Sequence, residues 1–376
     1  MNSLGAVVLG FAVCASGWGQ SEVLVTGLQG PQKLLMTPQG NFLVSETSME
    51  VNAGRISFVS RAGTRRSLFE GMPSGTEVAG GGSGPSAMAL RDRTLYVSIG
   101  GGDTERRDTT GASIHNPAGI SSPIYSSVLE VHFNASVDSL TGTFKMTPAQ
   151  QVALSDGETV ELVDGAGGSA SVSVLVDFPN SIMHPLTKYK FSNPWGLALS
   201  ADGATLWATD ASQNSLVKIN TSTGRWQRVV RFPALRNAGA VGPPLIDAVP
   251  TSVRIHGEEL LVSFLTGFPF TPGYARVDAV DPSKKTSSPF IYGVSSAVDV
   301  LCRSKSDGST QCFLLEFSTN QSAAQPPPGR LLRYDSPQPE VVLSDLRAPV
   351  SLAFDETAQE LFILELSGRL LKLPVH

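Results

Sequence analysis

The stretch PWGLALSADGATLWATD, residues 194–210, decides the fold of this chain. It contains two short apolar runs, separated by the turn-forming residues Ser-Ala-Asp-Gly. Two apolar runs joined by a turn with glycine are typical of a β-hairpin. A proline opens the stretch and an acid closes it, which gives a pattern that can be followed through the chain.

The same pattern occurs six times. Its copies begin near residues 31, 85, 194, 250, 296 and 349. Each copy is followed by a third apolar run, and most are followed by a fourth, so that the unit repeats about every fifty residues. Four short strands at this period are typical of a propeller blade. We therefore expect an all-β fold, a six-bladed β-propeller of four-stranded antiparallel blades.

The two ends of the chain predict how the ring closes. The sixth copy ends after its third run, while EVLVTGLQGP (22–31) precedes the first copy and resembles EVVLSDLRAP (340–349). We expect this N-terminal run to be the fourth strand of the last blade, which would hide an open sheet edge.

The second copy contains an insertion at about residues 138–192, rich in Gly and Ser. Insertions in repeat proteins often form loops on the binding face, so His184, near its end, is a candidate ligand-binding residue. The alternative is that the insertion adds strands to a blade edge.

Composition excludes several classes of protein. Charged residues make up 16% of the 376 residues, and the chain contains 37 Gly and 25 Pro, which argues against disorder and against a helical bundle. A net charge of −5 gives no support for nucleic-acid binding.

The N-terminus predicts export. Residues 4–15, LGAVVLGFAVCA, form an apolar run that is too short to span a bilayer and is followed by small residues. We expect a signal peptide over residues 1–19 and a secreted or periplasmic propeller over 20–376, with no transmembrane segment. A lipoprotein acylated at Cys14 and a chain that is not exported are the alternatives.

Cys302 and Cys312 flank a turn, Ser-Asp-Gly, between two apolar runs. Pairing about this turn places the two cysteines opposite each other, so we predict a disulfide. Two buried thiols are the alternative.

The second apolar run ends in an acid in four of the six copies. These acids are Glu46, Asp210, Glu316 and Glu365. Equivalent positions lie at similar distances from the axis of a propeller, so the four carboxylates are candidate ligands of a cation in the channel. Calcium suits such an all-oxygen site, with Asn193 and Asp247 as further candidates. Alternatively, each acid accepts backbone hydrogen bonds at a nearby turn.

The segment LTGFPFTPGYARV (265–277) places aromatic residues among glycines and prolines. Phe268, Phe270 and Tyr274 are candidate ligand-binding residues, because rigid aromatic loops provide stacking surfaces. Alternatively, they fill the gap between blades. The chain has no GxSxG, HExxH or CxxC motif, so no catalytic residue is assigned.

The export segment, the six copies and the segments SNPWGLA (192–198), DAVPTSV (247–253) and 265–277 resemble the ScyD/ScyE family. These are exported NHL-like propeller proteins named from the gene cluster for scytonemin, a cyanobacterial sunscreen pigment. The resemblance covers about residues 21–376 and implies architecture and compartment, but no catalytic residues. The insertion and the cysteine pair depart from the family pattern.

Three functions remain open at this point. The first is a binding protein for a small molecule, a glycan or a protein partner. The second is a metal-dependent hydrolase or lyase of the gluconolactonase or strictosidine-synthase-like type, with a cation in the channel. The third is a structural scaffold at the cell surface.

Overall fold

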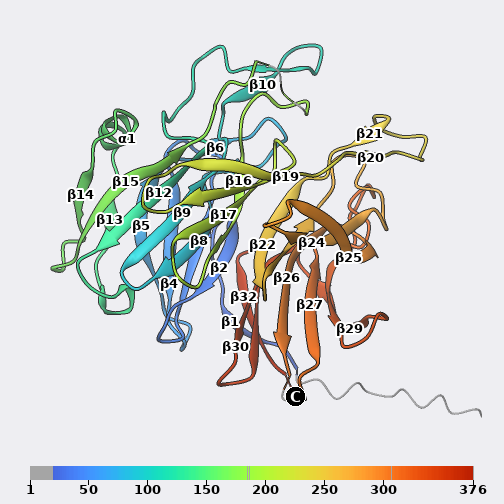
Figure 1. The fold of residues 1–376 in the computed structure, drawn as a ribbon. Coiled ribbons are helices and arrows are strands. Elements are labelled where there is room, and N and C mark those ends of the chain that lie inside the picture. Colours follow the sequence, from blue (N-terminus) through green and yellow to red (C-terminus); the bar gives the residue numbers. More distant parts are fainter. Residues whose placement is uncertain (1–19, 184, 186, 306, 376) are drawn as a thin grey trace, which may run out of the picture.

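The structure is a computed structural model that describes residues 20–183, 185, 187–305 and 307–375. Six sheets, each with four antiparallel strands, form the blades of a propeller (Figure 1), which confirms the predicted fold class. The proposed signal peptide lies outside the described residues.

The first three blades contain the strands of the first three copies. Blade one consists of β2 (Pro31–Met36), β3 (Phe42–Glu46), β4 (Gly54–Val59) and β5 (Arg65–Met72). Blade two consists of β8 (Pro85–Arg91), β9 (Thr94–Ile99), β12 (Ser127–Phe133) and β15 (Ser169–Asp177). Blade three consists of β16 (Pro194–Leu199), β17 (Thr205–Asp210), β18 (Ser215–Asn220) and β19 (Trp226–Arg231).

The other three blades complete the ring. Blade four consists of β22 (Pro250–His256), β23 (Glu259–Phe264), β24 (Ala275–Asp281) and β25 (Thr286–Val294). Blade five consists of β26 (Ala297–Ser304), β27 (Thr310–Glu316), β28 (Gly329–Tyr334) and β29 (Glu340–Leu346). Blade six consists of β30 (Pro349–Asp355), β31 (Glu360–Glu365), β32 (Arg369–Pro374) and β1 (Glu22–Val25).

The first strand of every blade lies at the axis. These strands contact one another in a closed cycle, β2–β8–β16–β22–β26–β30 and back to β2. Apolar side chains fill the space between neighbouring blades, as where Phe42 of blade one and Phe362 of blade six pack with their ring centroids 4.6 Å apart. The inner strands of each sheet are therefore buried on both faces, which explains why their apolar runs are nearly continuous rather than alternating.

The N-terminal strand lies at the outer edge of the last blade. β1 pairs antiparallel with β32, with Glu22 opposite Lys372 and Val23 opposite Leu371. Lys372 Nζ lies 3.0 Å from Glu22 Oε2. After the strand, Leu28 is buried and its N–H donates to the carbonyl of Gly368. The beginning and the end of the described chain are thus held in one sheet.

Most of the insertion widens the neighbouring blades. β13 (Phe144–Lys145) pairs with β5 of blade one, and β14 (Val160–Val163) pairs with β15 of blade two. Between them, α1 (Pro148–Ser155) begins at a capping box of Thr147 and Gln150. Residues 138–177 therefore follow the edge-strand alternative, whereas the residues just before blade three return to the axis.

Smaller elements gather at one end of the ring. The hairpins β6 (Gly75–Thr76) with β7 (Gly82–Ser83), β10 (Glu105–Arg107) with β11 (Ser113–His115), and β20 (Leu235–Arg236) with β21 (Leu245–Ile246) lie at the top in Figure 1. A 3₁₀ turn, Val137–Ser139, follows β12.

The predicted disulfide is confirmed. Cys302 of β26 lies directly opposite Cys312 of β27, and the two are bonded with their Cα atoms 4.0 Å apart. Among the helices in the described part of the chain, none combines the length and apolar composition that crossing a membrane requires.

Candidate functional site: a pocket at the mouth of the channel

A pocket of about 500 Å³ opens at the end of the channel where the chain enters each first strand. Six aromatic residues line it: Tyr189, Phe191, Trp195, Phe268, Phe270 and Phe317. Its charged and amide-bearing wall includes Gln32, Lys33, Glu77, Arg107, Lys188, Asn193, Asp247 and Gln321. We call this cavity the mouth pocket. An apolar surface with a few converging polar groups is typical of small-molecule sites.

Two of the three aromatic residues predicted from the 265–277 segment line this pocket. Phe268 is 51% exposed, and its ring meets that of Phe270 edge to face at a centroid distance of 6.4 Å. Phe270 adopts a left-handed backbone (φ 56°) in a turn closed by a bond from its N–H to the carbonyl of Gly267. Tyr274 lies elsewhere, where its hydroxyl accepts a hydrogen bond from the N–H of Ala238. His184 lies outside the described residues.

The end of the insertion supplies the opposite aromatic wall. Tyr189 and Phe191 pack edge to face at 5.8 Å, and Gln213 Nε2 donates to the carbonyls of both. Trp195 follows at the start of β16. The last few residues of the insertion therefore lie at a candidate binding site, as the first alternative expected. The rest of the insertion adds strands to blade edges, as the second alternative expected.

Glu77 is one of two acids that line the mouth pocket. It lies in the β6–β7 hairpin, where Asn193 Nδ2 donates to its Oε1 at 3.0 Å. Desolvation raises the pKa of Glu77 to about 7, although hydrogen bonds from Ser83 and Asn193 oppose this shift. A carboxyl with this pKa exchanges a proton near neutral pH.

The four predicted metal-binding acids have other partners. Each is buried at the end of a second strand and accepts a hydrogen bond from the backbone N–H that precedes the first strand of its own blade. The four pairs are Gln29 to Glu46 (2.5 Å), Asn193 to Asp210 (2.9 Å), Ser295 to Glu316 (2.6 Å) and Arg347 to Glu365 (2.7 Å). Arg330 and Arg369 add ion pairs to Glu316 and Glu365. The acids therefore hold the entrance turns of four of the six blades.

This geometry is the one that the backbone-bonding alternative describes, and the ring of calcium ligands stays a prediction. Among the described residues, no three His, Cys, Asp or Glu side chains are grouped as a metal site requires. Neither cavity of the channel is lined by Glu46, Asp210, Glu316 or Glu365. Asn193 and Asp247 do line the mouth pocket, but Asn193 binds Glu77, and Asp247 accepts from Asn214 Nδ2 at 3.0 Å.

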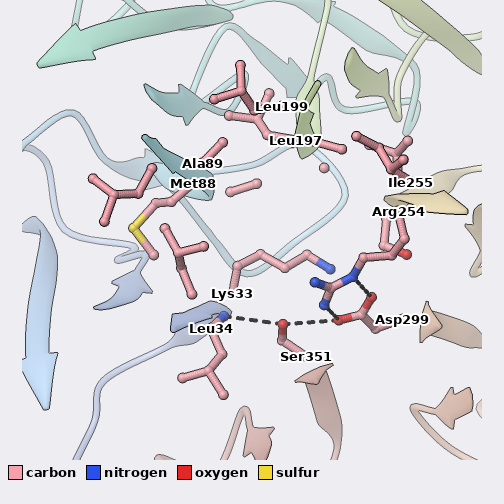
Figure 2. A pocket seen from close by; sticks show the side chains of 17 residues that line it. Lys33, Leu34, Met88, Ala89, Leu197, Leu199, Arg254, Ile255, Asp299 and Ser351 are labelled. Atoms are coloured by element: carbon pink, nitrogen blue, oxygen red, sulfur yellow. Dashed lines mark hydrogen bonds and ion pairs between the residues drawn. The ribbon is translucent and has the colours of Figure 1, made fainter. Parts of the chain in front are cut away.

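Below the mouth pocket lies an inner cavity of about 290 Å³ with a buried ion pair (Figure 2). Arg254 of blade four donates to both oxygens of Asp299 of blade five, at 3.1 and 2.6 Å. Asp299 also accepts from Ser351 Oγ and from the N–H of Leu352 in blade six. Ser351 Oγ in turn accepts from the N–H of Leu34 in blade one. Four blades are thus joined by one polar cluster.

The charges of this cluster are unequal. Burial alone would raise the pKa of Asp299, but the positive charges of Arg254 and Lys33 lower it to about 2. Burial lowers the pKa of Lys33 to about 8; Asp299 partly opposes this shift and Arg254 adds to it. One carboxylate therefore faces two basic groups.

Sequence reasoning missed Lys33, Glu77 and Trp195, although the repeat contains a signal for two of them. In five blades the second residue of the first strand lines the mouth pocket: Gln32, Trp195, Thr251, Val298 and Val350. In all six blades the third residue of that strand lines the inner cavity: Lys33, Ala87, Gly196, Ser252, Asp299 and Ser351. Aligning the six copies at these two positions would have indicated the channel lining.

Comparisons with known proteins support the fold alone. No family model and no curated protein matches the chain. A putative phosphatase from Bacteroides thetaiotaomicron is similar in structure, with a TM-score of 0.52 and 10% identity over 93% of this chain and 72% of that chain.

Two further structures are similar over nearly the whole chain. Virginiamycin B lyase from Staphylococcus aureus has a TM-score of 0.47 and 12% identity, covering 95% of this chain and 99% of that chain. A putative oxidoreductase (glucose dehydrogenase) from Thermus thermophilus has a TM-score of 0.48 and 16% identity, covering 95% and 100%. At such identities a shared propeller does not define function, and the comparisons do not show membership of the ScyD/ScyE family.

Proposed function

We propose that this protein is an exported propeller that binds a small organic molecule in the mouth pocket. The observation that carries this proposal is the lining of the pocket. Aromatic rings from the insertion, from β16 and from the β23–β24 connection face a half-buried carboxyl and a buried amine. A volume of about 500 Å³ matches a ligand of metabolite size.

The compartment forms part of the same proposal. The apolar run at residues 4–15 favours export, and the disulfide between Cys302 and Cys312 is compatible with an oxidising compartment. The resemblance to the ScyD/ScyE family, carried by segments 192–198, 247–253 and 265–277, supports an exported binding protein. Two of these segments contribute Asn193, Trp195, Phe268 and Phe270 to the pocket.

The alternative of a cation-dependent hydrolase or lyase loses the observation that motivated it, because the four acids bind the turns of their own blades. For a scaffold function, the described part of the chain offers no specific observation. We therefore retain small-molecule binding as the proposed function.

Fluorescence of Trp195 tests the proposal. The mature protein is titrated with libraries of metabolites and glycan fragments, and a ligand in the mouth pocket is expected to change the emission and raise the melting temperature. Phe268→Ala should weaken binding of any compound found by about tenfold, since it removes a stacking surface.

Phe290→Ala is the matched control, because Phe290 is also exposed and lies on β25 of the same blade, away from the pocket. Binding that Phe268→Ala leaves unchanged, or that Phe290→Ala weakens equally, would place the ligand outside the mouth pocket.

A further inference from the structure

Lys33 stands at the boundary between the two cavities of the channel. It is the residue that lines both the mouth pocket and the inner cavity. In three other first strands the boundary falls between consecutive residues: Thr251 and Ser252, Val298 and Asp299, Val350 and Ser351. The first of each pair faces the mouth pocket, and the second faces the inner cavity.

The amine of Lys33 forms few hydrogen bonds. Nζ makes one long contact, 3.5 Å to the carbonyl of Val298. Figure 2 shows the side chain extending toward the pair of Arg254 and Asp299, but the carboxylate oxygens of Asp299 already accept bonds from Arg254, Ser351 and Leu352. An ammonium has three donors, so this site satisfies a charged Lys33 poorly.

The residue is nevertheless reachable. Lys33 is 8% exposed, and it lines the mouth pocket as well as the inner cavity. A small molecule seated between the aromatic walls therefore has the amine at the floor of its site. Burial, a neighbouring cation and access from one side are the conditions that activate an amine as a nucleophile.

We propose that Lys33 forms an imine with an aldehyde or ketone held in the mouth pocket. This inference rests on the proposed function and narrows its ligand class to carbonyl compounds with an aromatic or apolar body. The geometry that carries it is a buried, poorly bonded amine that closes the floor of an aromatic pocket.

The chemistry balances without a further reagent. The lone pair of neutral Nζ attacks the carbonyl carbon, a C–N bond forms, and the π electrons move to the oxygen. The nitrogen loses two protons in total, and the oxygen leaves with them as water, so amine and carbonyl give imine and water. The lowered pKa of Lys33, about 8, supplies a sizeable neutral fraction at pH 7.5, which an ordinary lysine lacks.

Reductive trapping tests the inference on the intact protein. The protein is incubated with benzaldehyde and sodium cyanoborohydride at pH 7.5, then digested, and modified lysines are quantified by mass spectrometry. Lys284 is the internal control, because its bond to Asp281 raises its pKa and keeps it protonated. Lys33 is expected to be modified at least about tenfold more than Lys284, with half-maximal labelling near pH 8.

Equal labelling of the two lysines, or labelling of Lys284 alone, would overturn the proposal. Lys33→Arg should abolish the label at this position while thermal melting confirms that the variant is folded. The trapping result is independent of the fluorescence titration. An unlabelled Lys33 overturns the imine even if a library compound binds, and a labelled Lys33 supports it even if none does.

Discussion

The side-chain amide of Asn193 donates a hydrogen bond of 3.0 Å to Glu77, joining the chain that enters blade three to the hairpin that precedes blade two. The Oδ1 atom of Asn193 accepts from the N–H of Gly101 at 3.1 Å, and its own N–H donates to Asp210. Asn193 therefore fixes the position of the Glu77 carboxyl at the wall of the mouth pocket.

This relationship predicts a pH dependence of stability. The pKa of Glu77 rises from 4.5 to about 7 on folding, so between these values the folded state binds more protons than the unfolded state. Stability contributed by protonated Glu77 is therefore lost as pH rises from 4.5 to about 7. Glu77→Gln should raise the free energy of unfolding by about 1–3 kcal/mol at pH 8 and change it little at pH 4.

Urea unfolding at the two pH values measures this effect. Glu50→Gln is the control, because Glu50 is exposed and should leave the pH dependence as in the wild type. A Glu77→Gln variant that is less stable than the wild type at pH 8 would show that Glu77 is not a desolvated acid.

The buried ion pair of Arg254 and Asp299 predicts that replacing Asp299 greatly lowers the free energy of unfolding. Asp299→Asn leaves the Arg254 charge without its counter-ion and should cost about 3–5 kcal/mol at pH 7. Since the pKa of Asp299 falls to about 2, its contribution is present above pH 3.8 and is lost as pH falls toward 2, so the two proteins should converge in acid.

Chemical denaturation from pH 2 to pH 7 measures this difference. Asp345→Asn, on the exposed outer strand of the same blade, is expected to change stability by less than about 0.5 kcal/mol. Similar losses in the two variants would contradict a special role for the channel pair.

The fold was predictable because each blade repeats one local pattern. A hairpin such as 194–210 shows its strands and its turn within seventeen residues, and six copies fix the blade number. The acids at the ends of the second strands were visible too, but sequence alone could not distinguish convergence on the axis from hydrogen bonding within each blade. That choice depends on side-chain direction, which only the structure gives.

The mouth pocket was less predictable, because distant segments form it. Phe268 and Phe270 lie in an unusual loop and were recognisable. Burial raises the pKa of Glu77, and its hydrogen-bond partner Asn193 lies more than a hundred residues later in the sequence. Burial lowers the pKa of Lys33, and the nearby charge of Arg254 lowers it further. No local sequence pattern shows either effect.

Because the acids at the blade entrances bind backbone N–H groups, we expect them to contribute to stability without a metal ion. Glu365→Ala should lower the free energy of unfolding by about 3–5 kcal/mol, because Arg369 and the N–H of Arg347 lose their acceptor. Calcium or EDTA should leave the melting temperature of the wild type unchanged. A calcium-dependent rise in melting temperature that Glu365→Ala abolishes would restore the metal interpretation.

The disulfide predicts a moderate effect on stability. Cys302 and Cys312 are separated by ten positions, so the link removes about 2–3 kcal/mol of unfolded-state chain entropy. The double variant Cys302→Ser/Cys312→Ser should melt at a lower temperature and lose its sensitivity to reducing agents. A reducing agent that shifts the melting of this variant as much as that of the wild type would contradict the assignment.

The pairing of β1 with β32 has a consequence for biosynthesis. A ribosome makes the first strand of this pair before any blade exists and the second only after five blades have been made. Until then the emerging chain is an open arc whose final sheet exposes an unpaired border. The last folding event therefore joins the two extremes of the chain, and such long-range pairing is slow. During that interval the border is open to pairing with other chains.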